Sequence, residues 1–362
     1  MKNIFKIALV ALLSLSLVAC GGEEPTEPVE TEETVETEGC PVKIGLVTDT
    51  GGVDDKSFNQ SSWEGLVQFA KDNGLSYGTD SDSCVRYLQS ASEADYIPNL
   101  SAFADEGCDL VMAIGFLFNS SVAEVAPLYP DTKFLIVDEA VEGENVTSAV
   151  FSAEQGGFLV GVAAGLEAAE NGSNQVGFMG GMEGPIIGAF QAGYEQGVLA
   201  ANPECKIYIE YSNSFDDDTI GQNLAKKMYD AGATVVFQAA GACGNGVIRE
   251  ARERQGEVWA IGVDKDQYED GILESGDSII LTSMLKRVDR AVYQVAEDLL
   301  NGELEAGTRL FDLTNEGVGA EVTEGRNLSE ETIATILDYA AKIEAGELTV
   351  SAEPTIAAGS TN

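Results

Sequence analysis

Short apolar runs alternate with amphipathic segments from residue 43 to residue 345, which is the pattern of alternating strands and helices. In the first half of the chain the predicted strands are 43–48, 85–89, 110–114 and 133–137, and the predicted helices are 58–72, 93–105 and 120–128. A series of this kind predicts one doubly wound α/β unit around a parallel sheet.

The same alternation starts again after a connecting segment at 146–151, and it predicts a second unit of similar size. The strands of this unit are 175–179, 206–211, 234–238 and 258–263, and its helices are 158–169, 186–199, 220–230 and 247–255. The last third adds strands 279–285 and 308–313 and helices 288–300 and 329–345, which are too few for a third domain. We expect this last part to cross back and complete both units.

The expected fold class is therefore α/β, with two doubly wound parallel-sheet lobes joined by a multi-strand hinge. We assign 40–145 and about 265–305 to an N-terminal lobe, 146–264 and about 306–346 to a C-terminal lobe, and 347–362 to a flexible tail. Loops that follow the strands can all face the cleft between such lobes. Two hinged lobes describe a binding protein that closes on its ligand.

The first 39 residues stand apart from this pattern. Residues 1–6 are basic and 7–18 are almost wholly apolar, and small residues then precede Cys20. Residues 1–20 thus match a lipoprotein signal peptide with a lipobox, in which Cys20 is lipidated, whereas a plain signal peptide with an incidental cysteine is the alternative. Residues 21–39 are rich in Glu, Thr and Pro and predict an acidic, disordered tether. We expect a folded body anchored by lipid to the outer face of the cell membrane, in the periplasm if an outer membrane is present.

Charge and residue content exclude several kinds of function. The chain has 61 acidic and 20 basic residues, a formal net charge of −41, which disfavours nucleic acid as a partner. It has no histidine, so Ser-His-Asp and Cys-His nucleophiles are excluded, and a metal centre is not expected. The Gly-rich loops lack the Gly-Lys-Ser/Thr of a phosphate loop, and Gly241, Gly244 and Gly246 have the wrong spacing for a dinucleotide site. We therefore expect no cofactor.

Five cysteines remain after the predicted processing: Cys40, Cys84, Cys108, Cys205 and Cys243. Outside the cytoplasm, cysteines are expected to pair. The first three each precede a predicted strand of the same sheet, so two of them could form a disulfide at its amino-terminal edge, and the sequence leaves open which two. The odd number leaves at least one free thiol, and Cys243, in a Gly-rich loop, is the predicted one.

The stretch 45–60 is the strongest candidate for a ligand site. It runs from an apolar strand through a Gly/Asp loop into an amphipathic helix, with Asp49 after the strand and Phe58 and Asn59 at the start of the helix. Loops at the carboxyl ends of parallel strands direct N–H groups and short polar side chains into a common crevice. The alternative is that the Asp and Gly residues only form a turn.

Further candidates lie at other strand ends. Phe116, Phe190 and Phe215 lie at or near such loops, and their rings suit a planar ligand by stacking, although a phenylalanine can equally belong to the core. Asp138 and Asp264 each follow a strand, where a carboxylate can accept paired hydroxyls such as those of a ribose or can cap a helix. Two more residues complete this set. Lys286 could balance these carboxylates or simply be solvated, and Gly241 allows close backbone approach or shapes a turn.

Six segments resemble the basic membrane protein family of ABC-transporter substrate-binding lipoproteins, which includes the purine nucleoside receptor. They are 47–60, 113–118, 179–185, 238–251, 259–267 and 282–289, and the resemblance covers most of 41–345. The resemblance implies the type I periplasmic binding protein fold and a nucleoside ligand.

The same resemblance implies roles for single residues. Asp49, Phe58 and Asn59 correspond to a polar contact, a base-stacking ring and an amide, and Asp264 and Lys286 resemble a ribose-binding pair. Asp138 and Phe215 match less closely, because the loops around them vary in length. In the glycine-rich loop, Cys243 departs from the family pattern.

The sequence thus predicts a lipid-anchored extracytoplasmic receptor that delivers a nucleoside, foremost a purine nucleoside, to an ABC importer without catalysis. We expect a monomer whose partners are the permease subunits and the membrane, through Cys20. The predicted ligand-binding residues are Asp49, Phe58, Asn59, Asp138, Phe190, Phe215, Gly241, Asp264 and Lys286. The alternatives are a binder of another ringed metabolite, such as a flavin or a sugar-like signal, and a nucleosidase-type enzyme that uses pairs of aspartates.

Overall fold

The structure is a computed structural model that describes residues 39–362. The predicted signal peptide, Cys20 and the predicted tether up to residue 38 lie outside the described residues. No helix within 39–362 combines the length and the apolar character needed to cross a membrane.

The first lobe is built on a seven-stranded sheet whose strands all pair in parallel, in the order β12-β6-β5-β4-β1-β3-β2. The strands are β1 (Ile44–Thr48), β2 (Tyr77–Gly78), β3 (Val85–Gln89), β4 (Leu110–Ile114), β5 (Lys133–Val137), β6 (Val146–Phe151) and β12 (Gly307–Phe311). Leu46 packs under α1 (Phe58–Asp72) and α8 (Val288–Asn301), while the next residue, Val47, packs under α2 (Tyr96–Asp105) and α3 (Asn119–Val125). Both faces of the sheet are therefore covered, which explains why its central strands β1, β4 and β5 are almost wholly apolar.

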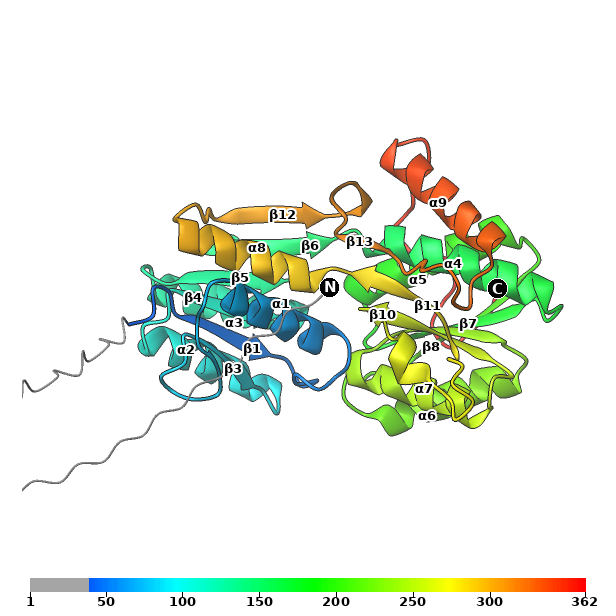
Figure 1. Ribbon diagram of the computed structural model, residues 1–362, viewed down its shortest axis with the longest axis horizontal. Coiled ribbons are helices and arrows are strands. Elements are labelled where there is room, and N and C mark those ends of the chain that lie inside the picture. The colour runs from blue at the N-terminus through cyan, green and yellow to red at the C-terminus, as the bar shows by residue number, and fades with distance from the viewer. Residues whose placement is uncertain (1–38) are drawn as a thin grey trace, which may run out of the picture. The chain divides into compact units, whose positions relative to one another are not determined.

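The second lobe repeats this arrangement on a six-stranded sheet with the order β13-β11-β10-β9-β7-β8. Its strands are β7 (Gln175–Gly180), β8 (Lys206–Tyr211), β9 (Val235–Ala239), β10 (Trp259–Asp264), β11 (Ile280–Lys286) and the antiparallel β13 (Val318–Ala320). Helices α4 (Ala153–Glu170), α5 (Pro185–Ala201) and α9 (Glu330–Glu344) cover one face, and α6 (Asp218–Asp230) and α7 (Asn245–Glu253) cover the other. The predicted class, two doubly wound α/β lobes, is confirmed (Figure 1).

Short 3₁₀ turns lead into or out of several helices and loops. They are η1 (Glu93–Asp95), η2 (Phe116–Phe118), η3 (Ala126–Leu128), η4 (Gly241–Gly244), η5 (Tyr268–Gly271) and η6 (Leu313–Asn315). Three of them, η2, η4 and η6, begin two residues after the last residue of a strand.

Glycines let the covering helices approach closely. A Cβ on Gly65 of α1 would lie 2.2 Å from the carbonyl oxygen of Asp289 in α8, and one on Gly197 of α5 would lie 2.0 Å from that of Phe158 in α4. Such distances are too short for any side chain, so these crossings require glycine. The small-residue composition of α4 and α5 is thus a packing requirement.

The predicted lobe boundaries were wrong at three places. Residues 146–151, expected as a connecting segment that opens the second lobe, form β6 of the first sheet between β5 and β12. The strand 280–286, expected in the first lobe, is β11 of the second sheet, and 307–311, expected in the second lobe, is β12 of the first. The chain therefore crosses between the sheets after β6, after β11 and after β12. No helix separates β5 from β6, so the usual signal of a parallel neighbour is missing from the sequence.

Residues 347–362, predicted as a flexible tail, instead lie along the second lobe. The buried carboxylate of Glu195 accepts hydrogen bonds from the backbone N–H groups of Thr355 and Ile356 and from the Thr355 hydroxyl. Thr361 forms an antiparallel bridge with Tyr208 of β8. These polar partners lie on α5 and β8, far away in sequence, and the local composition could not reveal them.

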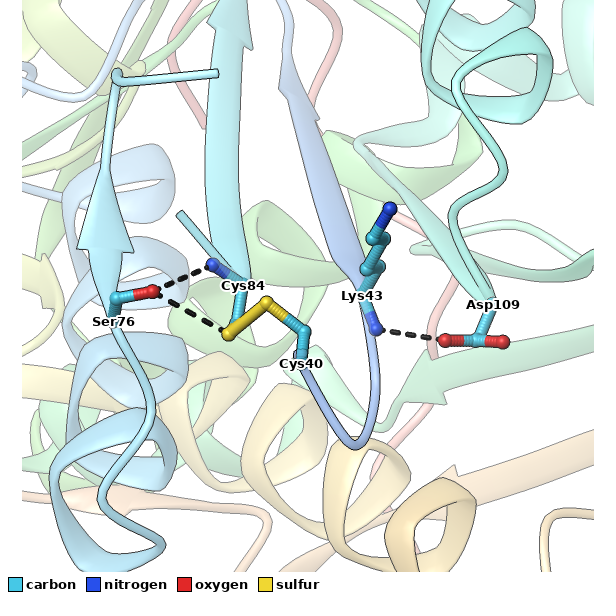
Figure 2. The surroundings of a disulfide bond; sticks show 5 residues. All are labelled: Cys40, Lys43, Ser76, Cys84 and Asp109. Carbon is cyan, nitrogen blue, oxygen red and sulfur yellow. Dashed lines mark hydrogen bonds between the residues drawn. A yellow bond between two sulfur atoms is a disulfide. The ribbon is translucent and has the colours of Figure 1, made fainter. Parts of the chain in front are cut away.

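A disulfide joins Cys40 to Cys84 at the amino ends of β1 and β3 (Figure 2), which answers the question that the sequence left open. The Ser76 hydroxyl accepts a hydrogen bond from the Cys84 N–H at 2.9 Å, and the Lys43 N–H donates to Asp109 at 2.7 Å beside it. Cys108, the third candidate for this disulfide, is free and buried. The prediction that Cys243 is free is confirmed, and Cys205 is free as well.

Candidate functional site

All nine predicted ligand-binding residues line one cavity between the two lobes, which partly opens to solvent. The first lobe contributes Asp49, Phe58, Asn59 and Asp138, and the second contributes Phe190, Phe215, Gly241, Asp264 and Lys286. Neither lobe holds the whole set. A ligand in this cavity would therefore contact both lobes at once.

The charged side chains reach the cavity because they stand at the carboxyl ends of strands. Asp49 follows β1, Asp138 follows β5, and Asp264 and Lys286 are the last residues of β10 and β11. Asp138 and Asp264 have φ angles of 71° and 66°, a left-handed conformation that is uncommon for residues other than glycine. Non-glycine residues in this conformation cluster at functional sites.

Among residues 39–362, Lys286 is the one cation of the cavity lining, and it is only 2% exposed. Its ammonium group forms an ion pair with the carboxylate of Asp138 across the cleft. Its Nζ also lies 4.7 Å from the ring centroid of Phe58, 5.0 Å from that of Phe151 and 5.5 Å from that of Phe190. Aromatic faces attract a cation, so these rings and the carboxylate together stabilise the buried charge.

A second set of polar side chains forms a hydrogen-bond network at the start of α1. The Asn59 Nδ2 donates to Asp49 Oδ1 at 2.7 Å and to Asp55 Oδ2 at 3.0 Å. Asp55 also accepts from the backbone N–H groups of Ser57, Asn59 and Gln60 at 2.8–3.0 Å, and so caps the helix. This network fixes the first-lobe side of the cavity.

Three carboxyl groups that line the cavity have raised pKa values. Burial raises the pKa of Asp49 to about 6, although the Gly51 N–H and the Asn59 amide oppose this. Burial also raises the pKa of Asp264 to about 7, against the opposing effects of Lys286 and of the Ser57 hydroxyl, which donates a hydrogen bond to it across the cleft. Asp55 has a raised pKa for the same reason. These carboxyl groups are therefore protonated more readily than an exposed aspartate.

Aromatic rings form the apolar walls. Phe116 of η2 and Phe215 of the β8–α6 loop meet edge to face across the cleft, with centroids 6.0 Å apart at 76°. Gly241 has a φ of 55° and lies against the Phe215 carbonyl, which accepts from the Cys243 N–H at 3.1 Å. Cys243, the departure noted in the sequence, is fully buried in the apolar cluster behind this loop and does not line the cavity.

Four polar contacts beside the cavity also join the lobes. In the first lobe, the carbonyl oxygens of Asp55 and Lys56 accept from the side chains of Asn245 at 3.1 Å and Gln267 at 3.0 Å. Two ion pairs accompany them: Lys56 with Asp270 at 2.8 Å, and Lys265 with Glu64 at 2.6 Å. The structure thus represents a closed arrangement of the lobes.

Sequence reasoning did not select several residues of the cavity wall: Gly51, Asp55, Gly115, Phe116, Ile187, Ala239, Ala240 and Val263. Phe116 was recognised as a ring near a strand end, and Gly51 as part of a turn. Asp55 carried a usable signal, since an acidic residue just before a helix often caps it. The apolar residues Ile187, Ala239, Ala240 and Val263 carry none, because each looks like the continuation of a buried strand or helix.

Two α/β lobes that both line one cavity are the arrangement of a small-ligand binding protein. The model of the family of PnrA-like ABC transporter substrate-binding proteins matches residues 42–353. The chain belongs to this family.

Individual relatives agree with this assignment. The chain is 38% identical to the CD4+ T-cell-stimulating antigen of Listeria innocua over 98% of this chain and 99% of the relative. It is 34% identical to the ABC transporter nucleoside-binding protein BmpA of Lactococcus lactis, over 92% and 95% of the two chains. The crystal structure of an ABC transporter solute-binding protein from Aeropyrum pernix superposes with a TM-score of 0.75 at 25% identity, covering 87% of this chain and 94% of the other.

Proposed function

We propose that this protein is an extracytoplasmic receptor that binds a nucleoside between its lobes and delivers it to an ABC importer. The observation that carries the proposal is the composition of one cavity, in which aromatic rings stand beside carboxylates and a single buried lysine. Aromatic rings suit a nucleobase, and carboxylates with a lysine suit the hydroxyls of a ribose. The name of the Lactococcus lactis relative supports the same class of ligand.

Closure would couple binding to transport. A ligand held by Asp49 and Asn59 on one lobe and by Asp264 and Lys286 on the other would favour the closed arrangement, because it binds that arrangement better than the open one. The permease subunits would then recognise the closed form. The proposal includes a lipid anchor at Cys20, action as a monomer, and no chemical change to the ligand.

Calorimetry with a panel of nucleosides and their free bases tests the proposal. We expect nucleosides to bind with micromolar or tighter affinity, and free bases to bind much more weakly because they lack the ribose. The same mixtures, incubated for hours and separated by chromatography, should still contain intact nucleoside. Release of free base would instead indicate a hydrolase that uses the buried aspartates, and binding of flavins or sugars alone would indicate another ringed metabolite.

The lipid anchor needs its own test. Expression in a bacterial host with labelled palmitate should label the full chain and place it in the membrane fraction. A Cys20→Ser variant should lose the label. Equal labelling of the variant would remove Cys20 as the anchor.

A further inference from the structure

The carboxamide of Asn59 has a fixed orientation. Its Nδ2 has two acceptors, Asp49 Oδ1 and Asp55 Oδ2, at 2.7 and 3.0 Å. Each of these two oxygens also accepts a backbone N–H, from Gly51 and from Asn59, and so acts as an acceptor; the amide nitrogen, and not the oxygen, must therefore face them. The orientation of the carboxamide therefore follows from its neighbours.

Asp55 is itself rigidly held. Its Oδ1 accepts from the N–H groups of Ser57 and Gln60, and its Oδ2 accepts from the N–H of Asn59. These three donors belong to the first turn of α1 and its approach, so the carboxylate cannot rotate without uncapping the helix. Because Asp55 is fixed by the start of α1, it also fixes the side chain of Asn59, which donates a hydrogen bond to it.

The oxygen of the Asn59 carboxamide, in contrast, lacks a hydrogen-bond donor among the described residues. Asn59 is 2% exposed and lines the cavity, and its Oδ1 is a buried acceptor without a hydrogen-bond partner among the described residues. Asp49 lines the cavity too, and both of its side-chain hydrogen bonds, from Gly51 N and Asn59 Nδ2, go to Oδ1. A buried acceptor without a donor is costly, and a donor group on a ligand in the cavity can satisfy it.

We propose that Asp55 fixes Asn59 as an obligate hydrogen-bond acceptor, so that the cleft selects nucleosides whose base donates a hydrogen bond from a ring N–H or an amino group. This inference rests on the proposed nucleoside function. Asp55 acts here as a positioning residue, because it reaches the ligand through Asn59. Bases with such a donor satisfy Asn59 Oδ1, whereas a base that carries only acceptors leaves it unpaired and places like partial charges together.

Inosine and purine riboside separate the two cases. They share the ribose and the fused ring, but inosine carries an N1–H donor and purine riboside has no N–H on its base. In calorimetry at pH 7.5 we expect purine riboside to bind wild-type protein about ten- to a hundredfold more weakly than inosine, the range for an unpaired buried acceptor. 1-Methylinosine, in which the donor is blocked, should be weakened in the same direction.

Variants assign this discrimination to the two residues. In Asn59→Leu the affinity ratio of inosine to purine riboside should fall close to one. In Asp55→Asn a side-chain amide replaces the second acceptor, the orientation of Asn59 is no longer imposed, and the ratio should fall at least severalfold. Asp54→Asn is the matched control, because Asp54 is the exposed neighbour in the same loop, and its ratio should equal that of wild type. Comparing two ligands on one variant removes general effects of the substitution on stability.

Equal affinity of wild type for inosine and purine riboside would overturn the inference while leaving the nucleoside function in place. The inference would also be overturned if Asn59→Leu lost the discrimination between inosine and 2′- or 3′-deoxyinosine but kept the discrimination between inosine and purine riboside. Asn59 would then contact the ribose and not the base. If no nucleoside binds to wild type, the proposed function fails and this inference fails with it. If Asp55→Asn does not fold, the wild-type ratio and Asn59→Leu still decide.

Discussion

The ammonium group of Lys286, at the end of β11, is paired with the carboxylate of Asp138, which follows β5, so one buried ion pair connects the second sheet to the first. Both side chains are less than a tenth exposed. Removing one partner of a buried pair leaves a charge without compensation, which costs about 3–5 kcal/mol.

We therefore expect Lys286→Met to weaken nucleoside binding by about 3 kcal/mol, or roughly a hundredfold. Much of this loss should come from closure, because Asp138 regains water when the lobes separate. Calorimetry gives the affinity, and small-angle scattering gives the degree of closure. Lys265→Met is the control, since the Lys265–Glu64 pair also joins the lobes but is reached by solvent, with side chains 29% and 49% exposed, and should contribute less than about 1 kcal/mol. Similar losses in both variants would contradict this reading.

Asp264 should make stability depend on pH. Its folded-state pKa of about 7 lies above the ordinary aspartate value of 3.8, so between these values the folded protein holds a proton that the unfolded chain has released. The stabilisation from this group is complete below pH 4 and is lost as the pH rises through 7. Between pH 5 and 8 we expect the loss of this proton to lower the free energy of unfolding by roughly 2–3 kcal/mol.

Denaturant unfolding at several pH values measures this effect as the difference between wild type and Asp264→Asn. The subtraction removes the contribution of the other acidic residues. A difference between the two proteins that does not change from pH 5 to pH 8 would mean that Asp264 keeps an ordinary pKa.

Phe58 should contribute to ligand binding through its ring. We expect Phe58→Ala to weaken nucleoside binding by roughly 1–3 kcal/mol, the usual contribution of an aromatic side chain that stacks on a base. Phe58→Leu keeps an apolar side chain at this position without the aromatic face, so a similar loss would identify stacking as the cause. Unchanged affinity in both variants would exclude Phe58 from the contact with the base.

The Cys40–Cys84 disulfide should matter for stability and not for binding. It closes a loop with a sequence separation of 44, for which loop entropy gives roughly 4 kcal/mol. We expect reduction, or the double variant Cys40→Ser/Cys84→Ser, to lower the free energy of unfolding by up to that amount, and a reductant should have no further effect on the double variant. Ligand affinity should not change, because the bond lies at the amino end of β1 and Asp49 at the other end. A large loss of affinity on reduction would refute this separation.

The crossing of α1 and α8 should tolerate only glycine at position 65. Gly65→Ala places a Cβ 2.2 Å from the Asp289 carbonyl, so the helices must separate, and we expect a loss of about 1–3 kcal/mol in unfolding experiments. Gly188→Ala is the control on α5, where the nearest atoms belong to Pro354 at 3.6 Å. That change should stabilise the helix by about 0.5–1 kcal/mol. Opposite signs for the two variants are the expected result.

The sequence predicted the order of the strands and helices well, because most strands here are buried on both faces and most helices have one apolar side. It did not predict which sheet β6, β11 and β12 join. Sheet membership depends on where the chain crosses between lobes, and residues such as Ala149 in β6 look the same in either sheet. A strand that follows its neighbour without a helix, as β6 follows β5, leaves no pattern to detect.

The candidate site was predicted by a different kind of information. Asp49, Asp138, Asp264 and Lys286 stand at strand ends, and the topology of parallel sheets brings such ends together. Asp55 was missed because three aspartates share the loop before α1, and only the path of the chain decides which one faces inward. On that path Lys56 has a φ of 60°, a left-handed conformation that a lysine does not lead one to expect from the sequence.

The residues beyond α9 have a consequence for solubility. Strand β8 is the outermost strand of the second sheet, and such an edge offers unpaired N–H and C=O groups on which another chain can add a strand. Ser360 and Gly359 exchange backbone hydrogen bonds with Ile209, and Asn362 bonds to the backbone of Ile207 and Cys205. The segment thus pairs with the edge of β8 and prevents a neighbouring molecule from adding a strand there. Truncation before this segment should lead first to strand-mediated aggregation, with the nucleoside cavity still intact.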